Sequence, residues 1–134
     1  MQDPDLLSEA EAVRLHAYAP YSNFPVGAAL LAEDGSLHHG CNVENASYPA
    51  GLCAERVALG AAVARGARRF IAIAIAGPPG VAISPCGICR QVLSEFSPDG
   101  TLRVIARDAA GTPRATTIVE LLPGAFGPAQ LGHS

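Results

Sequence analysis

The sequence FIAIAIA at Phe70–Ala76 predicts a buried strand. The run is apolar throughout, rich in Ile and short, and the turn sequence GPPG follows it at residues 77–80. A membrane-spanning helix needs about 18 or more consecutive apolar residues, and no run in the chain reaches that length. The sequence therefore indicates a globular domain that contains this strand.

Helical and extended patterns alternate on both sides of the strand. Two strand-like runs flank Asp34-Gly35, which is a strong hairpin signal, so part of the sheet is expected to be antiparallel. Because helices interleave with strands along the chain, we predict an α/β fold with a mixed five-stranded sheet and helices packed on its faces. The expected helices cover residues 4–19, 52–65 and 86–96, and the expected strands cover 26–33, 36–43, 70–76, 101–107 and 114–118.

Composition excludes several classes of protein. The 134 residues are 49% hydrophobic and 16% charged, which suits a single domain spanning residues 1–134. The net charge is −3 and all nine basic residues are Arg, so the chain lacks the basic surface of a nucleic-acid-binding protein and the polybasic segment of a membrane-surface protein. The N-terminal sequence has no secretory signal pattern, so we expect a cytoplasmic location, where the four cysteines stay reduced.

Three of the cysteines stand at the expected starts of two helices. Cys53 begins one helix in the sequence CAE, and Cys86 and Cys89 begin the other in PCGIC. Residues three apart on a helix share a face, and thiolates bind Zn²⁺ at about 2.3 Å in a tetrahedron. The positive end of each helix dipole also favours the thiolate form. The spacing therefore makes Cys53, Cys86 and Cys89 candidate zinc ligands.

Two other interpretations of these cysteines stay open at this level. The C-x-x-C pair alone would also suit a redox dithiol, and a structural zinc site would need Cys41 as its fourth ligand. Cys41 stands alone in a strand pattern and is better explained as a small buried hydrophobe. Glu55 favours a catalytic site, because a carboxylate beside a zinc-bound water can move its proton. Residues two apart inside a helix point to nearly opposite faces, so Glu55 qualifies only if Cys53 lies at the helix cap.

Several separated motifs together form the pattern of one family. Zinc deaminases carry H-x-E followed by P-C-x-x-C, and here CAE and PCGIC form a three-cysteine variant. The other matching stretches are PYSNFPVGAAL at 20–30, GCNVENASYP at 40–49, RQV at 90–92 and ELLPGAFGP at 120–128. Nearly from end to end, the chain resembles the small, homotetrameric, zinc-dependent cytidine deaminases. The resemblance implies a three-layer α-β-α fold and one Zn²⁺ per subunit.

The resemblance also implies a reaction and a set of contacts. The reaction is the hydrolytic deamination of cytidine and 2′-deoxycytidine to uridine and 2′-deoxyuridine with release of ammonia, a step of pyrimidine salvage. Zinc-bound hydroxide would attack C4 while Glu55 shuttles protons, and the sites would be shared between subunits of a homotetramer. By position in the motifs, the implied substrate-binding residues are Phe24, Asn42, Glu44, Tyr48, Ala54, Ser84 and Phe126.

Some of these roles have an independent physical basis. Asn42 and Glu44 alternate with a residue between them, so in a strand both would face the same way and could bind a hydroxyl, or both could simply be solvated on an edge strand. Three thiolates and Zn²⁺ sum to a charge of −1, and Arg56, three residues after Cys53, would offset it. Arg90, which follows a cysteine directly, is a second candidate for that role. Arg56 could otherwise be an ordinary surface residue of an Ala-rich helix.

Two competing functions share parts of this pattern. A deaminase that edits nucleic acid would use the same zinc chemistry, but the acidic chain without Lys and the ribose-binding pair favour a free nucleoside. A zinc-binding module without catalysis would need a fourth protein ligand. Whether Cys41 reaches the other three sulfurs distinguishes that module from an enzyme.

Overall fold

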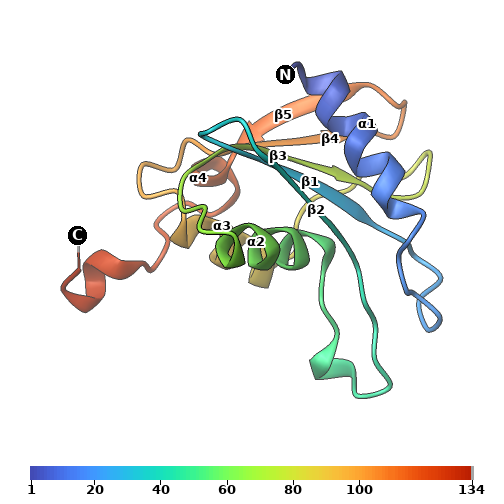
Figure 1. Ribbon diagram of the computed structural model, residues 1–134, viewed down its shortest axis with the longest axis horizontal. Coiled ribbons are helices and arrows are strands. Elements are labelled where there is room, and N and C mark those ends of the chain that lie inside the picture. Colours follow the sequence, from blue (N-terminus) through green and yellow to red (C-terminus); the bar gives the residue numbers. More distant parts are fainter. Residues whose placement is uncertain (134) are drawn as a thin grey trace.

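The computed structural model describes residues 1–133, which form a five-stranded sheet with helices on both faces (Figure 1). The strands are β1 (Gly27–Ala32), β2 (Leu37–Cys41), β3 (Phe70–Ala76), β4 (Arg103–Arg107) and β5 (Pro113–Thr117). The helices are α1 (Asp3–Arg14), α2 (Ala54–Ala64), α3 (Gly87–Glu95) and α4 (Ile118–Leu121), with short 3₁₀ helices η1 (Tyr48–Ala50) and η2 (Pro128–Leu131).

The predicted strand Phe70–Ala76 is β3, at the middle of the strand order β2-β1-β3-β4-β5. Its last five residues are buried, which explains the uninterrupted apolar sequence. β1 pairs antiparallel with β2 and β3, β3 pairs parallel with β4, and β4 pairs antiparallel with β5. The parallel pair needs a long crossover connection, and the segment containing α3 supplies it. The prediction of a mixed five-stranded sheet is therefore confirmed.

The two faces of the sheet carry different helices, so the fold has the three layers that were predicted (Figure 1). On one face, Leu6, Leu7 and Ala10 of α1 pack against β1, β3 and β4. On the other face, the larger core cluster joins α2, α3 and α4 to the sheet. Among the described residues, no helix is both long and apolar enough to cross a bilayer.

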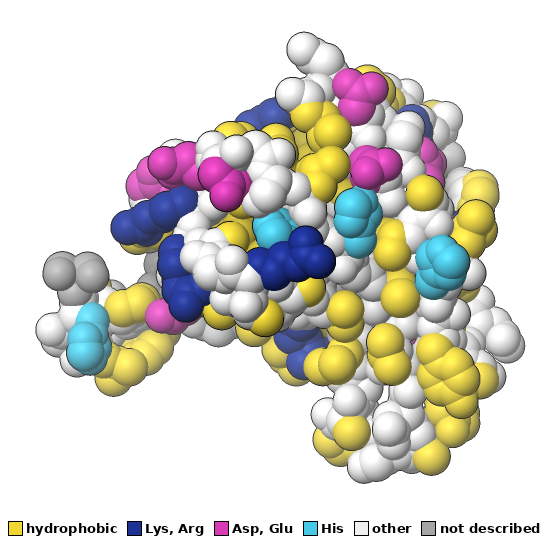
Figure 2. All heavy atoms as spheres, in the orientation of Figure 1, with side chains coloured by type: hydrophobic (Ala, Val, Ile, Leu, Met, Phe, Trp, Pro, Cys, Tyr) yellow, Lys and Arg dark blue, Asp and Glu magenta, His cyan; other side chains and the backbone are white. Residues whose placement is uncertain are grey.

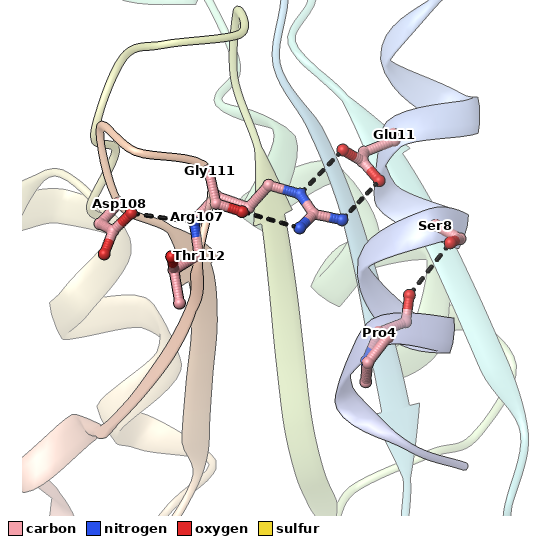
Figure 3. Close-up of polar contacts among 7 residues, drawn as sticks. All are labelled: Pro4, Ser8, Glu11, Arg107, Asp108, Gly111 and Thr112. Atoms are coloured by element: carbon pink, nitrogen blue, oxygen red, sulfur yellow. Dashed lines mark hydrogen bonds and ion pairs between the residues drawn. The ribbon is translucent and has the colours of Figure 1, made fainter.

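Two arginine–carboxylate ion pairs fasten α1 to β4. Arg103 of β4 donates to both carboxylate oxygens of Asp3, at 2.9 and 2.6 Å. Arg107, at the other end of β4, pairs with Glu11 at 3.1 and 3.3 Å and also donates to the carbonyl oxygen of Gly111 in the β4–β5 turn (Figure 3). Both pairs are partly exposed to solvent, which weakens ion pairs. They therefore fix the orientation of α1 and contribute little to the free energy of unfolding.

The first helix is shorter than the sequence predicted. It ends at Arg14 rather than near residue 19, and a turn at residues 15–16 leads to Tyr18, which forms an isolated β-bridge with Val43. The amide of Tyr18 donates to the carbonyl oxygen of Asn42, and the amide of Glu44 donates to that of Tyr18. These long-range hydrogen bonds take the place of further helical turns. Likewise, β2 ends at Cys41, so Asn42 and Glu44 follow the strand instead of lying inside it.

Candidate active site

Three thiols meet where the N-termini of α2 and α3 converge. Cys53 is the N-cap of α2, Cys86 is the N-cap of α3, and Cys89 is buried in the first turn of α3. Their Sγ atoms all lie within 4.8 Å of one another, and Cys53 Sγ and Cys86 Sγ are 3.8 Å apart. Within residues 1–133 this is the sole group of three or more candidate ligand atoms so close together, and Cys41 is not part of it.

The three sulfurs fit a zinc ion. Soft thiolates at the corners of a tetrahedron are a donor set that zinc prefers, and two helix N-termini supply positive dipole ends to the same place. Because the group contains three protein ligands and not four, it matches a catalytic zinc site, which keeps a position for water. The structural four-cysteine alternative needed Cys41, which lies outside the group.

Arg56 is the cation placed against these sulfurs. Its Nη2 donates to Cys53 Sγ at 3.7 Å and to the carbonyl oxygen of Gly51 at 3.3 Å. Its Nε is buried and finds no hydrogen-bond partner among the described residues. A hydrogen bond from Cys89 lowers the pKa of Cys53 to about 5, and the guanidinium of Arg56 contributes in the same direction. The arrangement stabilises negative charge on the Cys53 sulfur, as a metal-binding thiolate requires, while the hydrogen bond with Cys53 raises the pKa of Cys89.

Glu55 is buried beside the thiols, with a relative exposure of 5%. Burial raises the pKa of its carboxyl group, and the negative charge of Cys53 raises it further. The condition set by the sequence is met: Cys53 has extended backbone angles, φ −74° and ψ 153°, and therefore precedes the helix that Glu55 enters. A carboxyl group with a raised pKa next to a metal site holds its proton more readily than an exposed one, which suits a group that accepts and donates protons.

Asn42 and Glu44 both hold the loop that precedes β1. Asn42 accepts a hydrogen bond from the amide of Val26 at 2.9 Å and donates to the carbonyl oxygen of Phe24 at 2.9 Å. Glu44 accepts from the amides of Tyr21 and Ser22, at 3.0 and 3.1 Å, and from the Ser22 hydroxyl. These contacts organise the PYSNFPVG stretch, and they include Ser22, which the sequence did not mark as a site residue.

The remaining predicted contact residues lie at the surface of the single chain. Phe24 is 37% exposed, Phe126 57% and Tyr48 76%. The ring of Tyr48 meets that of Tyr21 edge to face at a centroid distance of 6.0 Å. Both rings and Glu44 line a surface depression of about 380 Å³. The structure thus brings Tyr48 and Glu44 to one depression and leaves three aromatic side chains partly solvated.

Ala54 and Ser84 lie next to the metal ligands along the chain. Ala54 is buried and is the first residue of α2, directly after Cys53. Ser84 is exposed, and its hydroxyl oxygen accepts a hydrogen bond from Arg90 at 3.0 Å. Arg90 also donates to two backbone carbonyls, so its hydrogen bonds go to neutral oxygens and it does not take the role expected of a second cation at the sulfurs.

Comparisons with known proteins identify the family of the chain. The family model for the cytidine and deoxycytidylate deaminase zinc-binding region matches residues 1–105. The chain is 47% identical to the cytidine deaminase of Sporosarcina psychrophila over 96% of this chain and 94% of that protein. It is 48% identical to that of Halalkalibacterium halodurans over 90% of this chain and 91% of that protein. The crystal structure of cytidine deaminase from Burkholderia pseudomallei superposes with a TM-score of 0.88, at 51% identity, over 94% of this chain and 100% of that one. The chain therefore belongs to the cytidine and deoxycytidylate deaminase family.

Proposed function

We propose that this protein hydrolyses cytidine and 2′-deoxycytidine to uridine and 2′-deoxyuridine and releases ammonia. The observation that carries the proposal is the buried Glu55 beside a group of three thiols at two helix N-termini. Family membership and relatives named cytidine deaminases support the same reaction. Zinc is the cofactor that the three sulfurs fit.

Each residue at the centre has a distinct task in this proposal. Cys53, Cys86 and Cys89 would hold the zinc, which supplies a coordinated water with a pKa lowered toward neutrality. Glu55 would take a proton from that water and deliver it to N3 of the pyrimidine, which makes C4 electrophilic. Glu55 would then take the remaining proton from the hydroxyl added at C4 and pass it to the exocyclic nitrogen, which leaves as ammonia while the oxygen of water stays on C4 as the carbonyl of uridine. The raised pKa of Glu55 suits a group that must both accept and donate.

The residues around the centre would select a nucleoside. Asn42 and Glu44 keep hydrogen-bonding capacity beyond the loop contacts already made, and we assign them to the ribose hydroxyls. Phe24 would pack against the nucleoside, and backbone groups of Ala54 and Ser84 would meet the pyrimidine edge. The net charge of −3 and the lack of Lys favour this small substrate over a nucleic-acid strand.

We further propose a homotetramer in which neighbouring subunits complete each site, by reaching it with Tyr48 and Phe126. The segment between β2 and α2 projects from the body of the chain, and Figure 2 shows hydrophobic side chains gathered on that projection. Tyr18, Tyr21, Val43, Tyr48 and Leu52 are all at least 40% exposed. Aromatic and aliphatic side chains exposed together favour burial against another subunit. A cytoplasmic location is proposed with it, because zinc binding requires the thiols to stay reduced.

The proposal is tested by measuring ammonia released from cytidine by the purified protein, with and without a chelator. We expect ammonia release from cytidine that follows the zinc content, and no release from a cytosine-containing oligonucleotide. Release from the oligonucleotide at a rate matching cytidine would favour an editing enzyme. Zinc binding with no ammonia from either substrate would overturn the proposal in favour of a non-catalytic zinc module.

A further inference from the structure

Arg90 makes an unusual set of contacts for a residue that follows a candidate zinc ligand. Its Nε donates to the carbonyl oxygen of Pro85 at 2.8 Å, and its Nη2 donates to the hydroxyl of Ser84 at 3.0 Å. Its Nη1 donates to the carbonyl oxygen of Leu121 at 2.8 Å. One half-buried guanidinium therefore contacts two segments that are more than thirty residues apart in the sequence.

The first segment leads directly into the zinc-binding cysteines. Pro85 is fully buried and immediately precedes Cys86, the N-cap of α3. Pro85 lies outside every helix and strand, so its carbonyl oxygen has no partner within a regular element. Arg90 satisfies this carbonyl from the first turns of the same helix. The guanidinium thus fixes the path of residues 84–86 over the start of α3.

The second segment carries Phe126. Leu121 is the last residue of α4, and Gly124, with φ +65°, turns the chain after it. The neighbouring Gln91 donates from Nε2 to the carbonyl oxygen of Phe126 at 2.8 Å. Arg90 and Gln91 therefore hold the two ends of residues 121–126, of which Pro123, Gly124 and Phe126 are exposed.

We propose that Arg90 is a positioning residue that couples the zinc-ligand loop 84–86 to the C-terminal segment 121–126, and so presents Phe126 in the orientation that a nucleoside site needs. Arg56 donates to a cysteine sulfur, whereas all three Arg90 contacts are neutral oxygens, so Arg90 acts by geometry and not by balancing the charge of the metal centre. Arg suits this task because its planar fork presents several donors in fixed directions, which Lys lacks. The part of the inference that concerns catalysis rests on the proposed function.

The test compares Arg90→Gln and Arg90→Lys with wild type. Arg68→Gln is the matched control, because Arg68 also donates to two backbone carbonyls, those of Val63 and Ala67, but lies in the turn after α2. Three kinds of measurement are made on the zinc-loaded proteins: zinc per chain, hydrogen exchange of the amides within residues 121–126 (Pro123 has none), and kcat and KM for cytidine.

We expect both Arg90 variants to keep zinc, to exchange these amides about tenfold faster or more, and to raise KM about tenfold while kcat changes less. Arg90→Lys should behave as Arg90→Gln does, because the charge alone does not restore the three contacts. Unchanged amide exchange in residues 121–126 would overturn the proposal. Loss of zinc from Arg90→Gln but not from Arg90→Lys would also overturn it, because the charge of residue 90 would then be what matters. If exchange rises but wild type does not deaminate cytidine, the positioning role stands and the proposed function fails. If Arg90→Gln does not fold, amide exchange in residues 121–126 is measured in Arg90→Lys and Gln91→Ala instead. Exchange as slow as in wild type in both variants would overturn the proposal.

Discussion

Gly40 of β2 lies directly against the backbone of Ala54, the residue between Cys53 and Glu55. A Cβ on Gly40 would overlap the carbonyl oxygen of Ala54 and the amide nitrogen of Ala58. Because Gly40 has no side chain, α2 packs directly against the backbone of β2. This contact sets the distance between the start of α2 and the sheet. Because Cys53 and Glu55 flank Ala54, the same contact places a zinc ligand and the proposed proton carrier.

Gly40→Ala should push the start of α2 away from the sheet. We expect a loss of roughly 1–3 kcal/mol in the free energy of unfolding, together with weaker zinc retention, because backbone and not a flexible side chain must move. Urea unfolding and the zinc content after dialysis against a chelator measure the two effects. Gly60→Ala is the control: it lies in the same helix with nothing within 4 Å of an added Cβ, and should stabilise the protein by about 0.5–1 kcal/mol. Equal effects of the two substitutions would contradict this explanation.

Arg56 is expected to tune the pH range over which zinc stays bound. Thiolates bind the metal, and Arg56 helps to hold the pKa of Cys53 below its usual range. In Arg56→Gln the pKa of Cys53 should rise, so half of the zinc should be released at a higher pH during acidification. Zinc affinity at neutral pH should be about 10–100-fold weaker. Chelator competition across a pH series measures both. Arg65→Gln, at the far end of α2, should match wild type, and a release curve for Arg56→Gln that also matches wild type would contradict the assignment.

The Asp3–Arg103 pair should make a pH-dependent contribution to stability. The hydrogen bonds from Arg103 hold the pKa of Asp3 below its ordinary value. A group whose pKa is lowered on folding stabilises the folded state above its unfolded pKa, about 3.9, and loses that contribution as pH falls through the folded pKa. Both side chains are about a third or more exposed, so solvent screening limits the effect to about 0.5 kcal/mol. A double-mutant cycle with Asp3→Asn and Arg103→Gln should give this coupling at pH 7 and none at pH values well below 3.9; coupling that grows on acidification would refute it.

Complementation tests the proposal that sites are shared between subunits. Phe126→Ala and Glu55→Gln chains should each give weak activity alone. If Phe126 reaches the site of a neighbour, co-expressed mixed assemblies will contain sites with both an intact Glu55 and an intact Phe126, and deaminase activity will rise above that of either parent. Two affinity tags confirm that the assemblies are mixed. If their activity stays at the average of the two parents, each chain completes its own site.

The sequence was sufficient where the signal is local. The apolar run of β3, the Asp34-Gly35 turn and the cysteine spacing each lie within a few residues, and the structure contains the corresponding strand, hairpin and thiol group. Contacts between segments that are far apart in the sequence leave no local pattern of this kind. Pairing of Tyr18 with Asn42 ended α1 early, and the bond from Arg90 to Leu121 could not be read from the position of Arg90 beside a cysteine. Asn42 and Glu44 likewise hold the PYSNFPVG loop, a role that a strand periodicity cannot reveal.

The most direct test of the central claim is the zinc content and turnover of Glu55→Gln. Glu55 is buried beside the thiols, so the amide should fit and the protein should keep as much zinc as wild type. The amide cannot carry the protons, and kcat for cytidine should fall by about 10²–10⁴-fold. Glu95→Gln, at the exposed end of α3, serves as control and should keep full activity. A Glu55→Gln protein that holds zinc and deaminates cytidine within a fewfold of the wild-type rate would contradict the account.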